Sequence, residues 1–384
     1  MIKIRTPKFN LRNNALLRNY NSDFLLDNFL EPEFRKKILP LYILQCLTLA
    51  PKYFIYYNLL TSNSRRTNMF IVANAIIISL KYSYDIAMFM NIIKVNLNAI
   101  YLSLVCLQLG SFFAVFIVNS LLTVLRSETN ARLIIQLQRI YCSCKIKMEV
   151  KHTMIINWIL LFSIILYHIV IFIIRMTIFN DSLSFTILTH VFVLSIDCSN
   201  IYMARVLTLF KNAILSWISE YQTLTTSITE ADDIRSSISK LESTYDELIE
   251  VLKMLQSVFG LPIACFVVTT FTQAMSNVQT LLEEPTWDFN FILALTWHMR
   301  NILLTIMISL ECEKIYTSLK NLQVTYVMSR MAVESTKGAF GGVLPDYGVL
   351  TAGAMLAVDA ALPACLLATI AAYAVVLLQI KFLS

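Results

Sequence analysis

Three of the four histidines of the chain, His168, His190 and His298, lie within long apolar stretches, where a polar side chain is costly. A neutral imidazole is a common ligand of Zn²⁺, so these residues are candidates for a metal site or for a membrane hydrolase. Such a hydrolase needs clustered His and Asp ligands around an activated water. Because no two histidines are three or four residues apart, the spacing predicts neither a metal nor another cofactor.

Sequence motifs of other enzyme classes are missing as well. The chain contains no nucleophile elbow, no nucleotide-binding fingerprint and no metalloprotease motif. We therefore expect a protein that is not an enzyme, in which these histidines either pack against other side chains or contact a ligand.

Several charged residues also fall inside apolar stretches, and their spacing indicates ion pairs within the protein. Lys81 and Asp85 are four residues apart, so they share one face of a helix. Asp197, Arg205 and Arg300 are expected to form similar pairs between helices, because an unpaired charge in hydrocarbon is costly. We predict structural roles for these residues; the alternative is that they carry a signal from a binding site.

The composition of the whole chain indicates the environment of these residues. Of 384 residues, 57% are hydrophobic and only 15% are charged, and the mean hydropathy is +0.65. A soluble domain carries about 25% charged residues. The chain is therefore predicted to be an all-α, polytopic membrane protein, since helices satisfy their own backbone hydrogen bonds in a bilayer.

Seven apolar stretches are long enough to cross a hydrocarbon core of about 30 Å, which takes about 20 helical residues. They cover residues 69–94, 99–125, 154–177, 184–210, 256–281, 289–312 and 357–380. An eighth stretch, 38–60, is interrupted by Pro40, Pro51 and Lys52. We interpret this eighth stretch as an interfacial or partly inserted helix rather than a span.

Basic residues are concentrated on one side of the predicted spans. Most of them fall in the N-terminal segment and in three loops of the same side, 126–153, 211–255 and 313–356. The positive-inside rule places this side in the cytoplasm. We therefore predict a cytoplasmic N-terminus and an extracellular C-terminus, with the glycosylation sequon at Asn180 on the outer side. The net charge of +6 then needs no nucleic-acid partner, because the basic residues face membrane lipid.

The segment before the fifth predicted span has the pattern of an amphipathic helix. Apolar residues recur at three-to-four spacing from residue 241 onward, at Leu241, Tyr245, Leu248, Leu252 and Leu255. We predict that this helix runs directly into the span and packs against other inner helices. The alternative is a location on the membrane surface, which the acidic polar face disfavours.

These patterns predict six successive regions of the chain. They are a cytoplasmic N-terminal segment with an interfacial helix (1–68), spans one to four (69–210), a cytoplasmic amphipathic helix (211–255), spans five and six (256–312), a cytoplasmic anchor helix with a glycine-rich joint (313–356), and a seventh span with a short extracellular tail (357–384).

The last thirty residues carry a motif of a known family. Ala371-Ala372-Tyr373-Ala374-Val375-Val376-Leu377-Leu378-Gln379-Ile380 resembles the signature of insect gustatory receptors, in which Thr-Tyr, five hydrophobic residues and Gln-Phe end the seventh span. The stretch from Gly353 to Asp359 is similar to the family's approach to that span, and Phe259-Gly260-Leu261-Pro262 and Leu47 to Pro51 also match. Ala372 and Ile380 are mild departures. Sugar-sensing members carry Glu after the tyrosine, where this chain has Ala374, so the resemblance disfavours a sugar ligand.

The resemblance implies a ligand-gated, non-selective cation channel in the plasma membrane of sensory neurons, with a bitter or other tastant as ligand. The family assembles as a homotetramer around a central pore that is lined by the seventh helix, and an assembly with related receptors is the alternative. The residues assigned to the pore and gate are Tyr373, Val376, Leu377, Gln379 and Ile380. We expect Gln379 and Ile380 at the narrow part, where a ring of isoleucines excludes water from the closed pore.

The family places its ligand pocket in the outer halves of spans two to six. The polar or amphipathic residues that the predicted spans put there are Gln108, His168, His190, Gln273, Trp297 and His298. Trp297 is the first choice for a contact, because an indole combines an apolar ring with a hydrogen-bond donor.

Glycine is rare in the chain and clustered in one place. Five of the seven glycines lie between Gly338 and Gly353, immediately before the seventh span. We interpret Gly348 and Gly353 as a hinge for the predicted gate helix, and a simple flexible tether is the alternative.

Two other functions compete with a channel. A secondary transporter predicts an internal repeat with paired broken helices, and the sequence shows no repeat, although Pro262 and Pro363 offer possible breaks. The second competitor is the inverted seven-span hydrolase, which the histidine spacing does not support.

Overall fold

The protein is almost entirely helical in its computed structural model, which describes residues 28–93, 99–144, 150–178, 183–226, 231–283, 289–334, 351–352 and 356–383. The helices are α2 (Pro32–Leu47), α3 (Arg65–Ile93), α4 (Ala99–Leu125), α5 (Ser127–Ser143), α6 (Val150–Ile178), α7 (Leu183–Thr226), α8 (Ala231–Glu283), α9 (Phe289–Glu334) and α10 (Leu362–Leu383). Two small antiparallel hairpins accompany them, β1 (Phe54–Tyr56) with β2 (Leu59–Thr61), and β3 (Thr351–Ala352) with β4 (Leu356–Ala357). The prediction of an all-α protein is confirmed.

Six helices of the described residues are long and apolar enough to cross a membrane. They lie at Arg65–Met88, Leu102–Leu125, His152–Thr177, Thr186–Thr223, Glu242–Gln279 and Leu362–Gln379. Each of these helices overlaps one of the seven predicted spans; the last helix, α10, begins at Leu362, five residues after the predicted start at 357, because Leu356–Ala357 form β4. The remaining predicted span, 289–312, lies on α9 and is not among the six found within the described residues.

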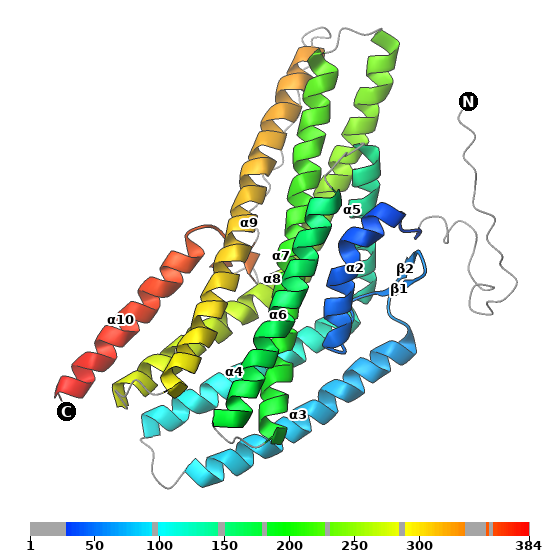
Figure 1. Cartoon of the computed structure of the whole chain (residues 1–384). Helices are drawn as coiled ribbons and strands as arrows, with labels where there is room; N and C mark the ends of the chain where they lie inside the picture. The colour runs from blue at the N-terminus through cyan, green and yellow to red at the C-terminus, as the bar shows by residue number, and fades with distance from the viewer. Residues whose placement is uncertain are drawn as a thin grey trace, which may run out of the picture.

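Helices α7, α8 and α9 continue far beyond the length of a membrane crossing. They contain 44, 53 and 46 residues, and at about 1.5 Å per residue each is roughly twice as long as a hydrocarbon core of about 30 Å. Figure 1 shows their far ends side by side in the upper part of the molecule, while α3 and α4 cross the lower part. Both α7 and α9 therefore continue directly into the segments 211–226 and 313–334. The sequence predicts inner loops or separate helices for these two segments.

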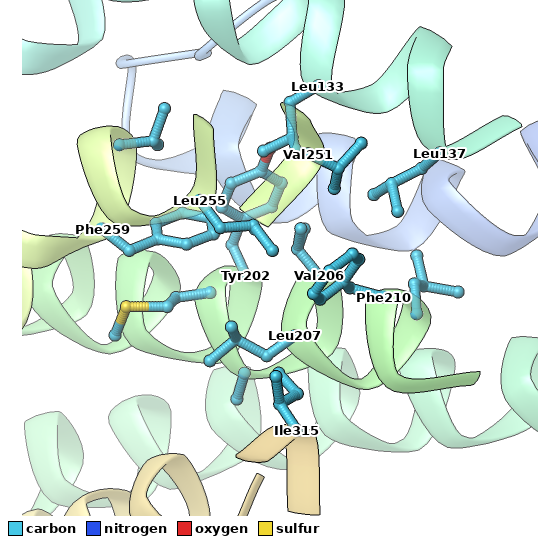
Figure 2. Close-up of a cluster of buried hydrophobic side chains, with 14 of the residues drawn as sticks. Leu133, Leu137, Tyr202, Val206, Leu207, Phe210, Val251, Leu255, Phe259 and Ile315 are labelled. Atoms are coloured by element: carbon cyan, nitrogen blue, oxygen red, sulfur yellow. The ribbon is translucent and has the colours of Figure 1, made fainter. Parts of the chain in front are cut away.

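The main hydrophobic core lies where the long helices meet α5. In Figure 2, Leu133 and Leu137 of α5, Tyr202, Val206, Leu207 and Phe210 of α7, Val251, Leu255 and Phe259 of α8, and Ile315 of α9 point toward one another. All ten side chains are completely excluded from solvent. Burying one such large apolar side chain contributes about 1.5–3 kcal/mol, so this region holds the long helices together.

The amphipathic segment before the fifth predicted span packs as expected. Tyr245, Leu248, Leu252 and Leu255 are buried in the main core, and Asp246 on the opposite face is exposed. The segment forms one helix with the span, since α8 runs from Ala231 to Glu283 without a break. Packing inside the protein, rather than on a membrane surface, is therefore confirmed for this stretch.

The N-terminal apolar stretch differs from its prediction in one respect. It was expected to be one helix over residues 38–60, but α2 ends at Leu47, and residues 54–61 form the β1–β2 hairpin. Leu49 has a positive φ of 57°, which is incompatible with continuing a right-handed helix. With 16 residues α2 spans about 24 Å, less than a hydrocarbon core, and it packs against α6 and α7.

Candidate functional site

Two histidines, an aspartate and an arginine from three helices form a buried polar network. His168 of α6 lies with one ring nitrogen, Nε2, 2.9 Å from Oδ2 of Asp197 on α7, and its Nδ1 is 3.3 Å from Nδ1 of His190, also on α7. Arg300 of α9 places Nη1 3.2 Å from the same Asp197 oxygen. Asp197 is completely buried, and a buried carboxylate needs such partners because it has lost its hydration.

The network continues from α9 to α8 through amide groups. The guanidinium of Arg300 donates from Nη2 to Oδ1 of Asn301 at 2.8 Å. Asn301 donates in turn from Nδ2 to Oε1 of Gln273. Both amide side chains are buried. Four helices, α6 to α9, are thus connected by one chain of polar contacts, which fixes their relative positions.

Aromatic rings cover one side of this network. The Trp297 ring of α9 lies 5.9 Å from the His190 ring, centre to centre, and Phe172 lies 5.8 Å from it. The Arg300 guanidinium carbon is 5.4 Å from the centre of the Trp297 ring, a distance at which a cation is attracted to an aromatic face. Indole and imidazole rings combined with fixed charges are typical of pockets for small amphipathic ligands.

Besides Nη1 of Arg300, which is ion-paired with Asp197 but makes no hydrogen bond, three buried polar atoms of the same cluster have no hydrogen-bond partner within the described part of the chain. They are Nε2 of His190, Oδ1 of Asp197 and Nε1 of Trp297. A buried polar atom without a partner costs about 1–3 kcal/mol, so native proteins rarely leave one unsatisfied. These atoms are available to a polar ligand or to water.

The structure brings together four of the six predicted ligand residues: His168, His190, Gln273 and Trp297. Gln108 on α4 is half-buried, and among the described contacts none joins its side chain to the network. His298 follows Trp297 on α9 and is likewise half-buried, with its Nδ1 lacking a partner among the described residues.

The sequence analysis assigned two members of the network, Asp197 and Arg300, to structural ion pairs. Their pairing across helices is confirmed, as is that of Lys81 with Asp85 at 2.7 Å. Asn301 was not singled out. Its position beside a charged residue within a predicted span could have marked Asn301 as a site residue, because polar groups inside a membrane need protein partners.

No group of three His, Cys, Asp or Glu side chains within the described residues is arranged to hold a metal ion. His168 and Asp197 are close enough to share a ligand, but Arg300 already occupies the same carboxylate oxygen. The arrangement is that of a charge-compensated polar cluster.

The predicted pore helix, α10, is attached to the rest of the chain along one side. Leu366 and Ile370 are buried with Ala274 of α8. Leu377 follows Ile370 by seven residues, about two helical turns, and is buried on the same side. Val376 and Gln379 are exposed, and Tyr373 is half-buried. The side chain of Ile380 lies outside the described residues, although its backbone belongs to α10.

The start of α10 is fixed by two carboxylates. Asp359 accepts hydrogen bonds on Oδ1 from the backbone N–H of Ala361 at 3.0 Å and of Leu362 at 3.2 Å. Glu313 of α9 accepts a longer one, at 3.4 Å, from the backbone N–H of Ala360. A direct contact therefore joins α9, which carries Trp297 and Arg300, to the first turn of α10. The proposed hinge residues Gly348 and Gly353, and Asn180 of the sequon, lie outside the described residues.

Comparison with solved structures identifies a protein of the same fold. The chain matches the insect olfactory receptor OR5 from Machilis hrabei with a TM-score of 0.61 and 13% sequence identity, over 90% of this chain and 98% of the receptor chain. No protein-family model matches the sequence, and no curated protein matches it either. The arrangement of helices is thus shared with a chemosensory receptor of insects at a level of identity that reveals the fold alone.

Proposed function

We propose that this protein is a chemosensory receptor that acts as a ligand-gated, non-selective cation channel. Two observations support the proposal independently: the gustatory-receptor motif around Tyr373 and Gln379, and the fold shared with an insect olfactory receptor over nearly the whole chain. The motif favours a gustatory role in the plasma membrane of sensory neurons. A tastant other than a sugar is the proposed ligand, because Ala374 replaces the glutamate of sugar-sensing members.

The observation that carries the proposal is the buried cluster of His168, His190, Asp197, Trp297 and Arg300. A soluble-enzyme site would expose such groups to water, whereas here they lie between apolar helices with three polar atoms unsatisfied. A small molecule with a polar group and an apolar body can satisfy these polar atoms and still pack between the apolar helices. Its polar group bonds to His190 and Trp297, and its apolar body lies against the indole ring.

Opening of the pore follows from the position of α9. This helix carries Trp297 and Arg300 at one level and Glu313 at another, beside the first turn of α10. A ligand that shifts α9 by a fraction of a turn changes the contact with α10, which lines the pore in a homotetramer or in an assembly with related receptors. The exposed residues Val376 and Gln379 face neighbouring subunits or the ions, and Ile380 closes the pore.

Ligand recognition is tested by whole-cell recording from cells that express the protein alone, with panels of bitter alkaloids, amino acids and sugars. We expect an inward cation current with a member of the first two panels. Trp297→Phe keeps the ring but removes the N–H donor, so about a tenfold higher concentration for half-activation is expected. Trp158→Phe, at a half-buried position of α6 beside Phe162, is the matched control and leaves the response unchanged. Equal responses of both variants would exclude Trp297 as a contact.

The gate is tested without any ligand. Ile380→Ala widens the proposed constriction and is expected to produce a leak current in unstimulated cells. Leu378→Ala removes a side chain about 200° around the same helix and should keep the channel closed. Unitary currents in patches distinguish a channel from a transporter. A silent Ile380→Ala variant that still reaches the cell surface would contradict the assignment of the gate.

A further inference from the structure

A small cavity lies at the junction of α4 and α5, away from the polar network. Its polar lining consists of Lys52, Asn119, Thr123, Arg126 and Asn130, and Val258 and Pro262 of α8 close it on the apolar side. The lining contains two cationic residues and no Asp or Glu. Its interior has about 10 Å³ of space for the centre of a water-sized sphere, which is room for roughly one water or one oxygen atom of a larger group.

Lys52 is a buried cation that meets no carboxylate among the described residues. Only 9% of its surface is exposed. Its ammonium donates to Oγ of Ser199 at 3.2 Å and lies 4.6 Å from the centre of the Tyr202 ring and 5.7 Å from that of Phe259. These partners are uncharged, so they compensate the lost hydration only in part. Burial accordingly lowers the pKa of Lys52 to about 7.

Arg126, which is half-buried, brings a second positive charge to the same cavity. Its Nη1 is buried without a hydrogen-bond partner in the described part of the chain, and a guanidinium stays protonated under all ordinary conditions. Arg126 also precedes the first turn of α5, where the helix dipole adds positive potential. Buried charges in proteins are normally paired, and the missing partner of Lys52 and Arg126 is therefore negative.

The position of the cavity indicates which anion is available. Arg126 follows directly after Leu125, the last residue of the candidate span Leu102–Leu125, so it lies at the depth of lipid headgroups. The loop that begins there is on the side where basic residues predict the cytoplasm. Phosphate groups are the abundant anions at this depth, and an arginine fork with a lysine is a typical phosphate-binding pair.

We propose that this cavity binds a phosphate group, one oxygen of which enters between the ammonium of Lys52 and the guanidinium of Arg126. The remaining phosphate oxygens and any organic part stay outside, since the interior accepts only one oxygen. Bound phosphate ties the loop before β1 to the α4–α5 junction and to α8. The group comes from an inner-leaflet lipid or from free phosphate, and the experiment separates these two sources.

The test measures thermal unfolding of the full-length protein, purified in detergent without added phosphate. The probes are inorganic phosphate and short-chain phosphatidic acid, with short-chain diacylglycerol as the uncharged control. A rise of the melting temperature with either anionic probe, but not with diacylglycerol, is expected. A response to inorganic phosphate identifies a free-anion site, and a response to phosphatidic acid alone identifies a lipid site. No shift with either probe overturns the proposal.

Two variants test whether the probe binds in this cavity. Arg126→Gln is expected to weaken binding of the effective probe by about tenfold or more, since a charge-assisted hydrogen bond is lost. Arg132→Gln removes an exposed arginine of the same helix and should bind as the wild type does. Equal weakening by both variants, or by neither, contradicts the assignment.

A variant that adds a negative charge to the cavity lining provides a second test in case Arg126→Gln fails to fold. Asn119→Asp places a carboxylate of nearly the same shape in the lining and supplies the missing negative charge within the chain. We expect a higher melting temperature without any probe and no further rise with phosphate or phosphatidic acid. A lower melting temperature with an unchanged response to the probe would overturn the proposal.

Discussion

Asp197 is the residue on which the buried polar network depends, because it alone carries the negative charge between His168 and Arg300. Replacing one member of a buried ion pair leaves the other charge without compensation and typically costs about 3–5 kcal/mol. His168 and Arg300 belong to different helices, so the loss of Asp197 affects the packing of α6, α7 and α9 together.

We therefore predict that Asp197→Asn lowers the melting temperature of the purified protein markedly and raises its protease sensitivity. Glu128→Gln is the matched control: it breaks a pair with Arg132 in which both side chains are about two-thirds exposed, and exposed pairs contribute only about 0–1 kcal/mol. Similar effects of the two substitutions in thermal unfolding would show that the network does not stabilise the bundle.

Lys52 makes stability depend on pH in a calculable direction. Its folded pKa of about 7 lies below the ordinary lysine value of 10.5, so the unfolded chain binds more protons between these two values and stability rises with pH across that window. The facing groups are Ser199, Tyr202 and Phe259 on α7 and α8, and Arg126 across the cavity. Burial of the ammonium is the cause of this shift.

The prediction is that Lys52→Met flattens this dependence in phosphate-free buffer. The variant removes the cost of burying a charge, which is on the order of several kcal/mol. Its free energy of unfolding therefore exceeds that of the wild type most near pH 7 and least near pH 10. Urea unfolding at these two pH values measures the difference. A constant difference between variant and wild type would show that Lys52 is not titrating in this window.

At the scale of elements, α9 connects the ligand cluster with the start of α10. Asp359 accepts hydrogen bonds from the N–H groups of Ala361 and Leu362 at the start of α10, and Glu313 accepts one from Ala360, two residues before that helix. An Asp at this position is among the best N-terminal caps, and its negative charge also interacts favourably with the helix dipole. The two carboxylates thus define where the proposed gate helix begins.

Asp359→Ala is expected to destabilise this first turn by about 1 kcal/mol, seen as faster amide hydrogen exchange at residues 360–364. Asp359→Asn retains an acceptor and restores most of the protection, since Asn caps as well as Asp does. In recordings, the Ala variant should also shift the concentration for half-activation while the Asn variant does not. Unchanged exchange in Asp359→Ala would show that the cap does not hold the helix start.

At the scale of the whole molecule, the odd number of proposed spans puts the two termini on opposite sides of the membrane. Basic residues crowd one side of the spans, and the rule that such a side is cytoplasmic assigns the N-terminus to the inside. Six spans are apparent from length and composition, and the seventh depends on α9, whose polar residues Arg300 and Asn301 are paired with other helices. Internal pairing removes much of the cost of placing them in a bilayer.

An epitope tag at each terminus tests this orientation. The C-terminal tag is expected to be labelled by antibody on intact cells, and the N-terminal tag only after permeabilisation. Labelling of both tags on the same side would mean that α9 does not cross, or that the segment around α2 does. Either outcome would also move the phosphate cavity relative to the cytoplasm.

The amino-acid sequence by itself determined the class of the protein, the positions of six apolar helices and the amphipathic face of α8. These properties depend on the average hydropathy and the periodicity of neighbouring residues, which are local and additive along the chain. Together with the pocket position that the resemblance to gustatory receptors implies, the same local signals placed His168, His190, Gln273 and Trp297 among candidates for one site, because a polar group in an apolar helix needs a partner.

Only the tertiary structure decided which partners these residues meet. Contacts such as that between His168 and Asp197, or between Asn301 and Gln273, join residues far apart in the sequence, and they depend on the angles and offsets at which helices cross, which no local pattern encodes. The cavity between Lys52 and Arg126 likewise exists because a loop, a helix junction and α8 converge there. Burial turned two ordinary basic residues into charges that need a partner, and burial is a property of the folded molecule.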